Sequence, residues 1–277
     1  MLVGVVGAGT MGSGIAQLFA SQGFDVILTD ADADQVARGR DRIAAALERE
    51  VAKGRLAAGD AAAARARLST GGLADLAECE LVVEAVFENP AAKRAVFEQL
   101  DALCPAGTIL ASNTSSLSIT DLGRGLSHPV VGMHFFNPVP VMRLVEVIAG
   151  RDTPPALVDE VVALATRLGK TPIRVNEAPG FVVNRIMMPM INEAVGVLAA
   201  GTASAEDIDT AMVLGANHPM GPLALADLIG LDVCLAIMEA MASDTGDPRL
   251  RPHPLLRELV DAGRLGRKSG RGFHRYG

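Results

Sequence analysis

The first thirty residues alternate between short apolar runs and a segment with helical spacing. Residues 2–6 and 26–28 are apolar runs of strand length, and residues 13–21 carry apolar positions at helical intervals. The first run leads directly into the glycine-rich turn GAGTMG at residues 7–12. This order predicts a strand, a tight turn, a helix and a second strand, which is how a parallel sheet of the α/β class begins.

Strand-like and helix-like segments continue to alternate as far as residue 175. Two Ala- and Arg-rich segments, 34–53 and 60–68, are separated by breakers at 54–59 and predict a helical hairpin. Further strands are expected at residues 81–87, 108–111, 130–134, 144–148 and 171–175, with helices at 90–103 and 155–168. The pattern predicts an α/β fold, an N-terminal Rossmann-like doubly wound sheet with an inserted helical hairpin.

The pattern changes after the tripeptide Ala178-Pro179-Gly180. Residues 181–200, 205–214, 223–243 and 254–262 are helical in spacing, and no convincing strand follows. We therefore expect two domains, residues 1–180 and an all-α C-terminal domain of residues 181–277. The apolar faces of these helices exceed what a domain of this size comfortably buries, which favours a homodimer formed through them, with ordinary core packing as the alternative.

Composition removes several classes of function. The 25 Lys and Arg residues are outnumbered by 32 Asp and Glu residues, and the resulting charge of −7 argues against general nucleic-acid binding. The three cysteines (Cys79, Cys104 and Cys234) have neither a close pair nor metal-ligand spacing, so we expect no metal, no disulfide framework and a reducing, cytoplasmic compartment.

The uncharged stretch of residues 1–24 is long enough to cross a bilayer as a helix. Five glycines between Gly4 and Gly14 interrupt it, and no Lys or Arg precedes Arg38 to form the basic region of a signal peptide. We therefore expect neither membrane insertion nor secretion.

The glycine-rich turn has the spacing GxGxxG of a dinucleotide-binding site. Gly7 permits the tight turn, Gly9 lets a pyrophosphate approach the backbone, and Gly12 lets the helix pack close to the sheet. Thr10 and Met11 lie inside the same turn, where the amides at the start of the helix favour phosphate. We expect all five residues to contact a dinucleotide, with a nucleotide-free structural domain as the alternative.

An acidic residue, Asp30, follows the second strand, 18 positions after Gly12. Its carboxylate can accept hydrogen bonds from a ribose diol but repels a 2′-phosphate. The next residues, Ala31, Asp32 and Ala33, supply no cation to offset that repulsion. The sequence therefore predicts NAD rather than NADP.

Polar side chains interrupt apolar surroundings at four further places. Ser112 to Ser116 and His134 to Pro138 follow predicted strands, Glu146 lies within another strand, and Asn184 opens the helical region. Ligands bind at the carboxyl ends of strands in open α/β sheets. On this pattern alone, His134 could instead be a structural histidine, and Glu146, which alternates with two valines, could face solvent.

Six segments together resemble a known family. They read GVVGAGTMGSGIAQ, ASNTSSLSIT, HFFNPVPVMRLVEVI, PGFVVNRI, HPMGPLALADLIGLD and GRLGRKSGRGFHRY, and they run in order from Gly4 to Tyr276. They are similar to the successive motifs of the L-3-hydroxyacyl-CoA dehydrogenase family, including its short-chain 3-hydroxybutyryl-CoA dehydrogenases. The resemblance implies NAD-dependent, reversible oxidation of an (S)-3-hydroxyacyl-CoA to the 3-ketoacyl-CoA.

The resemblance also implies roles for four residues. His134 matches the general base that takes the 3-hydroxyl proton, and Glu146 matches the carboxylate that orients its ring. Ser115 matches the hydroxyl that contacts substrate and cofactor, and Asn184 matches the substrate-binding amide. The chemistry is reasonable, because a secondary alcohol is too weak an acid to ionise unaided and an imidazole can accept its proton.

Four other residues are assigned to the cofactor by the same resemblance, and the charge of two more makes them candidates for CoA binding. The resemblance places Glu88, Lys93 and Asn137 near the nicotinamide ribose and brings Lys268 to the cofactor. Its hairpin clamps CoA, and Lys53 and Arg55 at the hairpin tip could meet the CoA phosphates. A solvated charged surface remains the alternative for each charged residue.

Two other functions remain open on the sequence. Relatives of this two-domain scaffold include NAD-dependent dehydrogenases of sugar acids and other hydroxy acids without CoA. A non-catalytic NAD-binding protein is the second alternative, although it need not keep His134, Glu146, Ser115 and Asn184 together.

Overall fold

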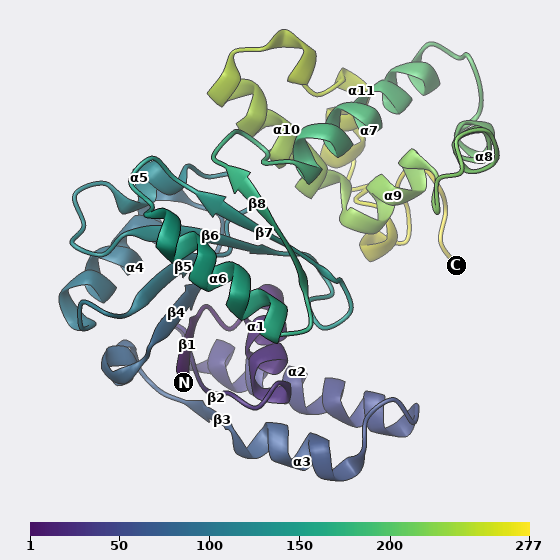
Figure 1. Ribbon diagram of the computed structural model, residues 1–277. Helices are drawn as coiled ribbons and strands as arrows, with labels where there is room; N and C mark the ends of the chain where they lie inside the picture. The colour runs from purple at the N-terminus through teal and green to yellow at the C-terminus, as the bar shows by residue number, and fades with distance from the viewer. The chain divides into compact units, whose positions relative to one another are not determined.

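The computed structural model describes residues 1–277, and the chain divides into two compact units, Met1–Ala178 and Pro179–Gly277 (Figure 1). The first unit is an α/β domain and the second consists of helices. The predicted fold class is therefore confirmed. None of the helices combines the length and apolar character needed to span a membrane.

The first unit is built on one eight-stranded sheet, in the order β3-β2-β1-β4-β5-β6-β7-β8. All neighbouring strands are parallel except β6 and β7, which are antiparallel. The last two strands therefore run against the other six. The strands are β1 (Leu2–Val6), β2 (Asp25–Thr29), β3 (Leu68–Thr70), β4 (Leu81–Glu84), β5 (Ile109–Ser112), β6 (Val130–Phe135), β7 (Leu144–Ala149) and β8 (Thr171–Asn176).

The helices of this unit form where the sequence supplies start signals. The Asn89 side chain accepts a hydrogen bond from Ala92 N at the start of α4, and Asp32 accepts one from Asp34 N at the start of α2. The helices are α1 (Thr10–Ser21), α2 (Ala33–Ala52), α3 (Ala58–Ala66), α4 (Pro90–Leu103), α5 (Ile119–Gly123) and α6 (Pro155–Arg167), with a 3-10 helix, η1, at Leu73–Glu78.

Three short elements were not expected from the sequence. The edge strand β3 has three residues, η1 has six and α5 has five. Segments this short do not complete the repeats on which a periodicity argument depends. Leu68, expected at the end of a helix, instead begins β3, which pairs with β2.

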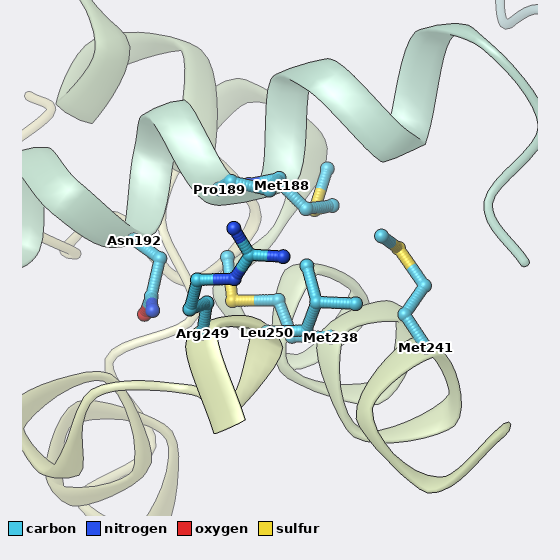
Figure 2. Close-up of a pocket in the computed structure, with 7 residues that line it drawn as sticks. All are labelled: Met188, Pro189, Asn192, Met238, Met241, Arg249 and Leu250. Atoms are coloured by element: carbon cyan, nitrogen blue, oxygen red, sulfur yellow. The ribbon is translucent and has the colours of Figure 1, made fainter. Parts of the chain in front are cut away.

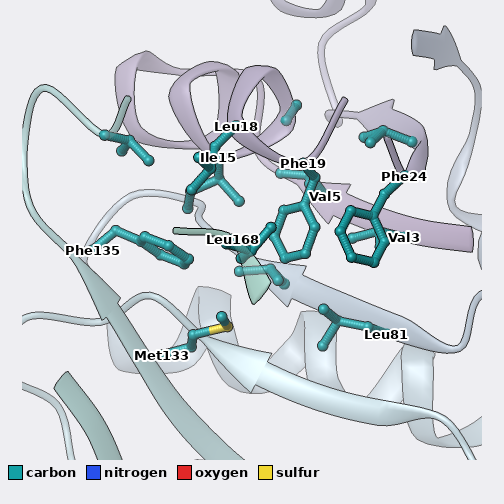
Figure 3. Close-up of a cluster of buried hydrophobic side chains, with 14 of the residues drawn as sticks. Val3, Val5, Ile15, Leu18, Phe19, Phe24, Leu81, Met133, Phe135 and Leu168 are labelled. Atoms are coloured by element: carbon teal, nitrogen blue, oxygen red, sulfur yellow. The ribbon is translucent and has the colours of Figure 1, made fainter. Parts of the chain in front are cut away.

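Part of the core of the first unit lies where α1 packs on the sheet (Figure 3). Ile15 and Phe19 of α1 are fully buried, and so are Val3 and Val5 of β1. Burying a side chain of this size stabilises the fold by about 1.5–3 kcal/mol. The Phe19 ring also meets the edge of Phe24 at 5.5 Å between centroids, which fixes the turn from α1 into β2.

The second unit contains α7 (Val183–Ala199), α8 (Ala205–Gly215), α9 (Pro222–Ile229), α10 (Leu231–Thr245) and α11 (Pro254–Asp261). Two 3-10 helices, η2 and η3, cover Pro248–Leu250 and Arg267–Ser269. The prediction of a single helix at residues 223–243 was wrong. Gly230 has a φ of 107°, which an α-helix cannot contain, so α9 ends there and α10 begins.

The core of this unit is rich in methionine. Met188 of α7 packs in one cluster with Met238 and Met241 of α10. Figure 2 shows the side chain of Arg249 lying across the same region. No volume large enough for a water molecule is left there. The methionine cluster is therefore core packing and not a ligand site.

Candidate active site

The glycine-rich turn connects β1 to the start of α1 at Thr10. Gly7 has a φ of 102°, and a Cβ on Gly12 would lie 1.7 Å from Gly7 O. A Cβ on Gly9, by contrast, would meet no atom within 4 Å. The first and third glycines are thus required for packing, while the backbone at Gly9 is open to a ligand at the N-terminus of α1.

Asp30 follows β2 and is fixed by two backbone amides. Its Oδ2 accepts a hydrogen bond from Ala8 N at 2.7 Å, and its Oδ1 accepts one from Asp32 N at 3.1 Å. The carboxylate lines a cavity of about 430 Å³ with Ala31, Ala33, Val36, Ala37, Arg40, Thr70, Gly71 and Gly72. A largely apolar cavity beside a fixed carboxylate fits the adenosine half of a dinucleotide.

Two arginines of α2 at this site were not found by sequence reasoning. Arg40 lines the cavity beside Asp30, so a cation is present that residues 31–33 do not supply. Arg42 Nη1 donates to Ala8 O at 3.1 Å and to Ser13 Oγ at 2.9 Å, which braces the glycine-rich turn. A spacing of 34 residues between Arg42 and Ala8 gives no local signal of this contact.

His134 and Glu146 form the central pair of the first unit. They lie directly opposite each other in the antiparallel register of β6 and β7, and His134 Nδ1 is 2.7 Å from Glu146 Oε2. Glu146 is fully buried and His134 is 6% exposed. Glu146 therefore does not face solvent. With the Nδ1 proton donated to the carboxylate, Nε2 is the ring nitrogen that can accept a proton.

Ser115 belongs to a loop after β5 that is organised around Glu88. Five donors converge on Glu88 Oε1, namely the hydroxyls of Thr114, Ser115 and Ser116 and the amides of Ser115 and Ser116, at 2.6 to 3.2 Å. Asn113 connects this loop to the neighbouring strand, because its Oδ1 accepts a hydrogen bond from Phe135 N at 2.9 Å. Ser115 and His134 are thus held at the same edge of the sheet.

Lys93 lies beneath this loop rather than on a surface. It is 1% exposed, and its Nζ is 2.7 Å from Glu84 Oε1 and 3.2 Å from Glu88 Oε2. The other oxygen of Glu84 accepts from Ser112 Oγ at 2.7 Å. Sequence reasoning missed Glu84, whose one available signal was a carboxylate inside the apolar run 81–87.

The pKa values of the two carboxyl groups beside Lys93 are shifted in opposite directions. Burial raises the pKa of Glu84, against the opposing charge and hydrogen bond of Lys93 and the hydrogen bond from Ser112. Desolvation alone would also raise the pKa of Glu88, but Lys93, Thr114 and the Ser115 amide together lower it. Glu88 is therefore held as a carboxylate at the edge of the sheet.

The remaining predicted site residues lie apart in the chain. Asn137 is exposed just after β6. The tip of the hairpin formed by α2 and α3 carries Lys53 and Arg55, and Arg55 donates two hydrogen bonds of 2.6 Å to Glu50. In the second unit, Asn184 is buried in the first turn of α7, and Lys268 Nζ is 2.6 Å from Asp232 Oδ1.

The three cysteine side chains are all buried. Burial raises the pKa of both Cys79 and Cys234 to about 12, and it also raises the pKa of Cys104. These buried thiols are protonated at neutral pH. No group of three or more His, Cys, Asp or Glu side chains is arranged to hold a metal ion.

A dinucleotide-binding turn and a buried His–Glu pair, both at the carboxyl edge of one sheet, define the class as an NAD-dependent dehydrogenase. Family models agree. Residues 2–178 match the NAD binding domain of 3-hydroxyacyl-CoA dehydrogenase, and residues 180–276 match its C-terminal domain. The chain belongs to the 3-hydroxyacyl-CoA dehydrogenase family, as its six motifs predicted, and it is an NAD-dependent oxidoreductase of CH–OH groups.

Individual relatives are similar over their whole length. The chain is 51% identical to a probable 3-hydroxybutyryl-CoA dehydrogenase of Bacillus subtilis, over 98% of this chain and 96% of the relative. It is 50% identical to a 3-hydroxybutyryl-CoA dehydrogenase of Clostridioides difficile, over 100% of this chain and 99% of the relative. The crystal structure of (S)-3-hydroxybutyryl-CoA dehydrogenase from Ralstonia eutropha superposes with a TM-score of 0.95 at 49% identity, covering 100% of this chain and 99% of that one.

Proposed function

We propose that the enzyme oxidises short-chain (S)-3-hydroxyacyl-CoA, with 3-hydroxybutyryl-CoA as its main substrate, to the 3-ketoacyl-CoA and catalyses the reverse reduction. The names of the full-length relatives support this substrate class. The observation that carries the chemistry is the buried contact of 2.7 Å between His134 Nδ1 and Glu146 Oε2.

His134 is the general base of the proposed reaction. Its Nε2 takes the proton of the 3-hydroxyl group during oxidation and returns it to the carbonyl oxygen during reduction. Glu146 holds the ring in one tautomer and stabilises the imidazolium that forms. Ser115 and Asn184 bind the reacting oxygen and the acyl group through a neutral hydroxyl and a neutral amide.

The cofactor-binding residues divide between the two ends of the dinucleotide. Gly7, Gly9, Thr10, Met11 and Gly12 bind the pyrophosphate, and Asp30 binds the adenosine ribose. Bound NAD supplies the acceptor for the hydride that leaves C3. Glu88, oriented by Lys93, together with Asn137 and Lys268, binds the nicotinamide end.

The CoA portion is assigned to the hairpin formed by α2 and α3. Lys53 and Arg55 contact the CoA phosphates in this proposal. Arg55 already pairs with Glu50, so its contribution depends on exchanging that carboxylate for a phosphate. Residues 1–180 thus bind NAD, while residues 181–277 bind substrate and form the dimer.

The direct test is the oxidation of NADH with acetoacetyl-CoA, followed by a series of longer acyl chains. We expect saturation with acetoacetyl-CoA and a decline in kcat/KM as the chain lengthens. Free acetoacetate is the matched control, because it has the same reacting ketone without CoA. Equal kcat/KM for the free acid would favour a dehydrogenase of non-CoA hydroxy acids, and NAD binding without any turnover would favour a non-catalytic protein.

The homodimer is supported by large apolar side chains that remain exposed on the second unit. Ile186 of α7 is 68% exposed, Leu214 of α8 is 79% exposed and Leu228 of α9 is 49% exposed. The mass of one chain is 28.7 kDa, and light scattering should give twice that mass. A protein that stays monomeric at high micromolar concentration would contradict the dimer.

The proposed compartment is the cytoplasm. All three cysteines are unpaired thiols, as expected under reducing conditions. Fractionation of cells that express the tagged full-length chain tests this assignment.

A further inference from the structure

The C-terminal segment of the chain is fixed by two buried aspartates. Asp227 Oδ1 accepts a hydrogen bond from Phe273 N at 2.9 Å, and its Oδ2 accepts from His274 N at 2.9 Å and from the Tyr276 hydroxyl at 3.0 Å. Asp209 Oδ2 lies 2.7 Å from His274 Nε2. The backbone of residues 271–276 therefore has one defined conformation.

Other side chains of this segment line a cavity. His274 and Tyr276 bond to the aspartates, whereas Arg271, Phe273 and Arg275 line a cavity of about 220 Å³. The rest of its lining comes from Leu198 of α7, from Leu255 and Leu259 of α11, and from Arg264 and Gly272.

Three arginines thus surround one cavity without a carboxylate. Arg264, Arg271 and Arg275 form no ion pair with Asp or Glu, and no acidic residue lines the cavity. The charge of Arg264, then desolvation, then the charge of Arg275 lower the pKa of Arg271. The three positive charges repel a further cation and attract an anion.

We infer that this cavity binds an organic phosphate, with the phosphate held by Arg264, Arg271 and Arg275 and an apolar substituent against Leu255, Leu259 and Phe273. Guanidinium groups bind phosphate oxygens through paired N–H donors, and three of them suit a dianion better than a monoanionic carboxylate. The apolar side chains distinguish the site from one for a bare ion. Neither Asn184 nor Lys268 lines it.

Butyl phosphate is a suitable probe, because it joins a dianionic phosphate to a short apolar chain. Its binding to the full-length protein is measured by calorimetry with NADH at saturation. The double variant Arg271→Gln/Arg275→Gln should bind it at least about tenfold more weakly, since two charge-assisted contacts are lost. The matched control, Arg151→Gln/Arg251→Gln, removes two exposed charges elsewhere and should bind like the wild type.

Two further probes separate the parts of the ligand. Inorganic phosphate lacks the apolar group and butyrate lacks the second charge, so both should bind more weakly than butyl phosphate. Butyl phosphate should also slow phenylglyoxal modification of Arg271 and Arg275, but not of Arg251, when the sites are mapped by mass spectrometry. Equal affinity of the two double variants, equal affinity for butyrate, or unprotected Arg271 and Arg275 would each overturn the inference.

Discussion

Glu146 faces His134 across β6 and β7, the one antiparallel pair of neighbouring strands in the sheet, and Glu146 Oε2 is 2.7 Å from His134 Nδ1. Both side chains are buried, so their contact is little affected by salt or by competing water. The pair has the geometry of a base and its orienting carboxylate. It leads to two separate predictions about catalysis.

Replacing His134 by Gln tests the base itself. Glutamine keeps much of the size and some hydrogen bonding but cannot carry the proton, so kcat for 3-hydroxybutyryl-CoA oxidation should fall by about 100- to 10,000-fold. NADH binding, followed by its fluorescence, should be unchanged. Near wild-type kcat in His134→Gln would place the base on another residue.

Replacing Glu146 by Gln tests the orienting carboxylate. The amide keeps the shape but removes the charge that favours imidazolium, so kcat should fall by about 10- to 100-fold, as for other carboxylates that orient a histidine. The binding of NADH should be unchanged, because Glu146 orients the histidine ring. A kcat equal to that of the wild type would show that Glu146 is a packing residue.

Asp30→Ala tests the choice of cofactor. Losing the carboxylate should weaken NAD(H) binding by about 1 to 3 kcal/mol, because a charge-assisted hydrogen bond to the ribose is removed. It should also narrow the preference for NADH over NADPH, since Arg40 at the same cavity then meets a 2′-phosphate without an opposing charge. Asp34→Ala, at an exposed position, is the control. An unchanged ratio of the KM values for NADH and NADPH in Asp30→Ala would contradict the assignment.

Asp101 predicts a pH dependence of stability outside the active site. Burial alone would raise its pKa, but hydrogen bonds from Ser127 N, the His128 ring and His128 N lower it. A lowered carboxyl pKa stabilises the fold above the unfolded value of about 3.9, and this stabilisation is lost as the pH falls through the folded value.

Asp101→Asn should therefore lower the free energy of unfolding at pH 7 by about 1 to 2 kcal/mol. The difference from wild type should begin to shrink below about pH 4, where the unfolded carboxyl becomes protonated, and should vanish once the pH falls below the lowered pKa of the native carboxyl. Urea unfolding at several pH values measures this, with the exposed Asp41→Asn as control. A difference that stays constant with pH would assign the effect to packing.

The sequence predicts the sheet better than the contacts around it. The glycine-rich turn, Asp30 and the strands have local signals, namely turn chemistry and apolar periodicity. The brace from Arg42 to Ala8 and the burial of Lys93 between Glu84 and Glu88 arise from tertiary packing and have none. The break at Gly230 was missed because apolar spacing continues through it, although the backbone does not.

The burial of Glu146 could not be predicted from the alternation of residue types alone. Period-two alternation shows that Glu146 and its neighbouring valines face opposite sides of the sheet, but it does not show which sides are covered. The structure covers both, because residues 145–148 of β7, which point alternately to the two faces, are all buried. The reversed direction of β7 then brings a residue near its beginning opposite one near the end of β6.

The proton-transfer pair thus belongs to the hydrogen-bonded ladder between β6 and β7 and not to a loop. Strands hold side chains with less freedom than loops do, so the spacing of acid and base is independent of the surrounding connections. Redesign of the enzyme for longer or branched acyl groups can therefore vary loops and helices other than those that carry Ser115 and Asn184, while the His134–Glu146 pair is left unchanged.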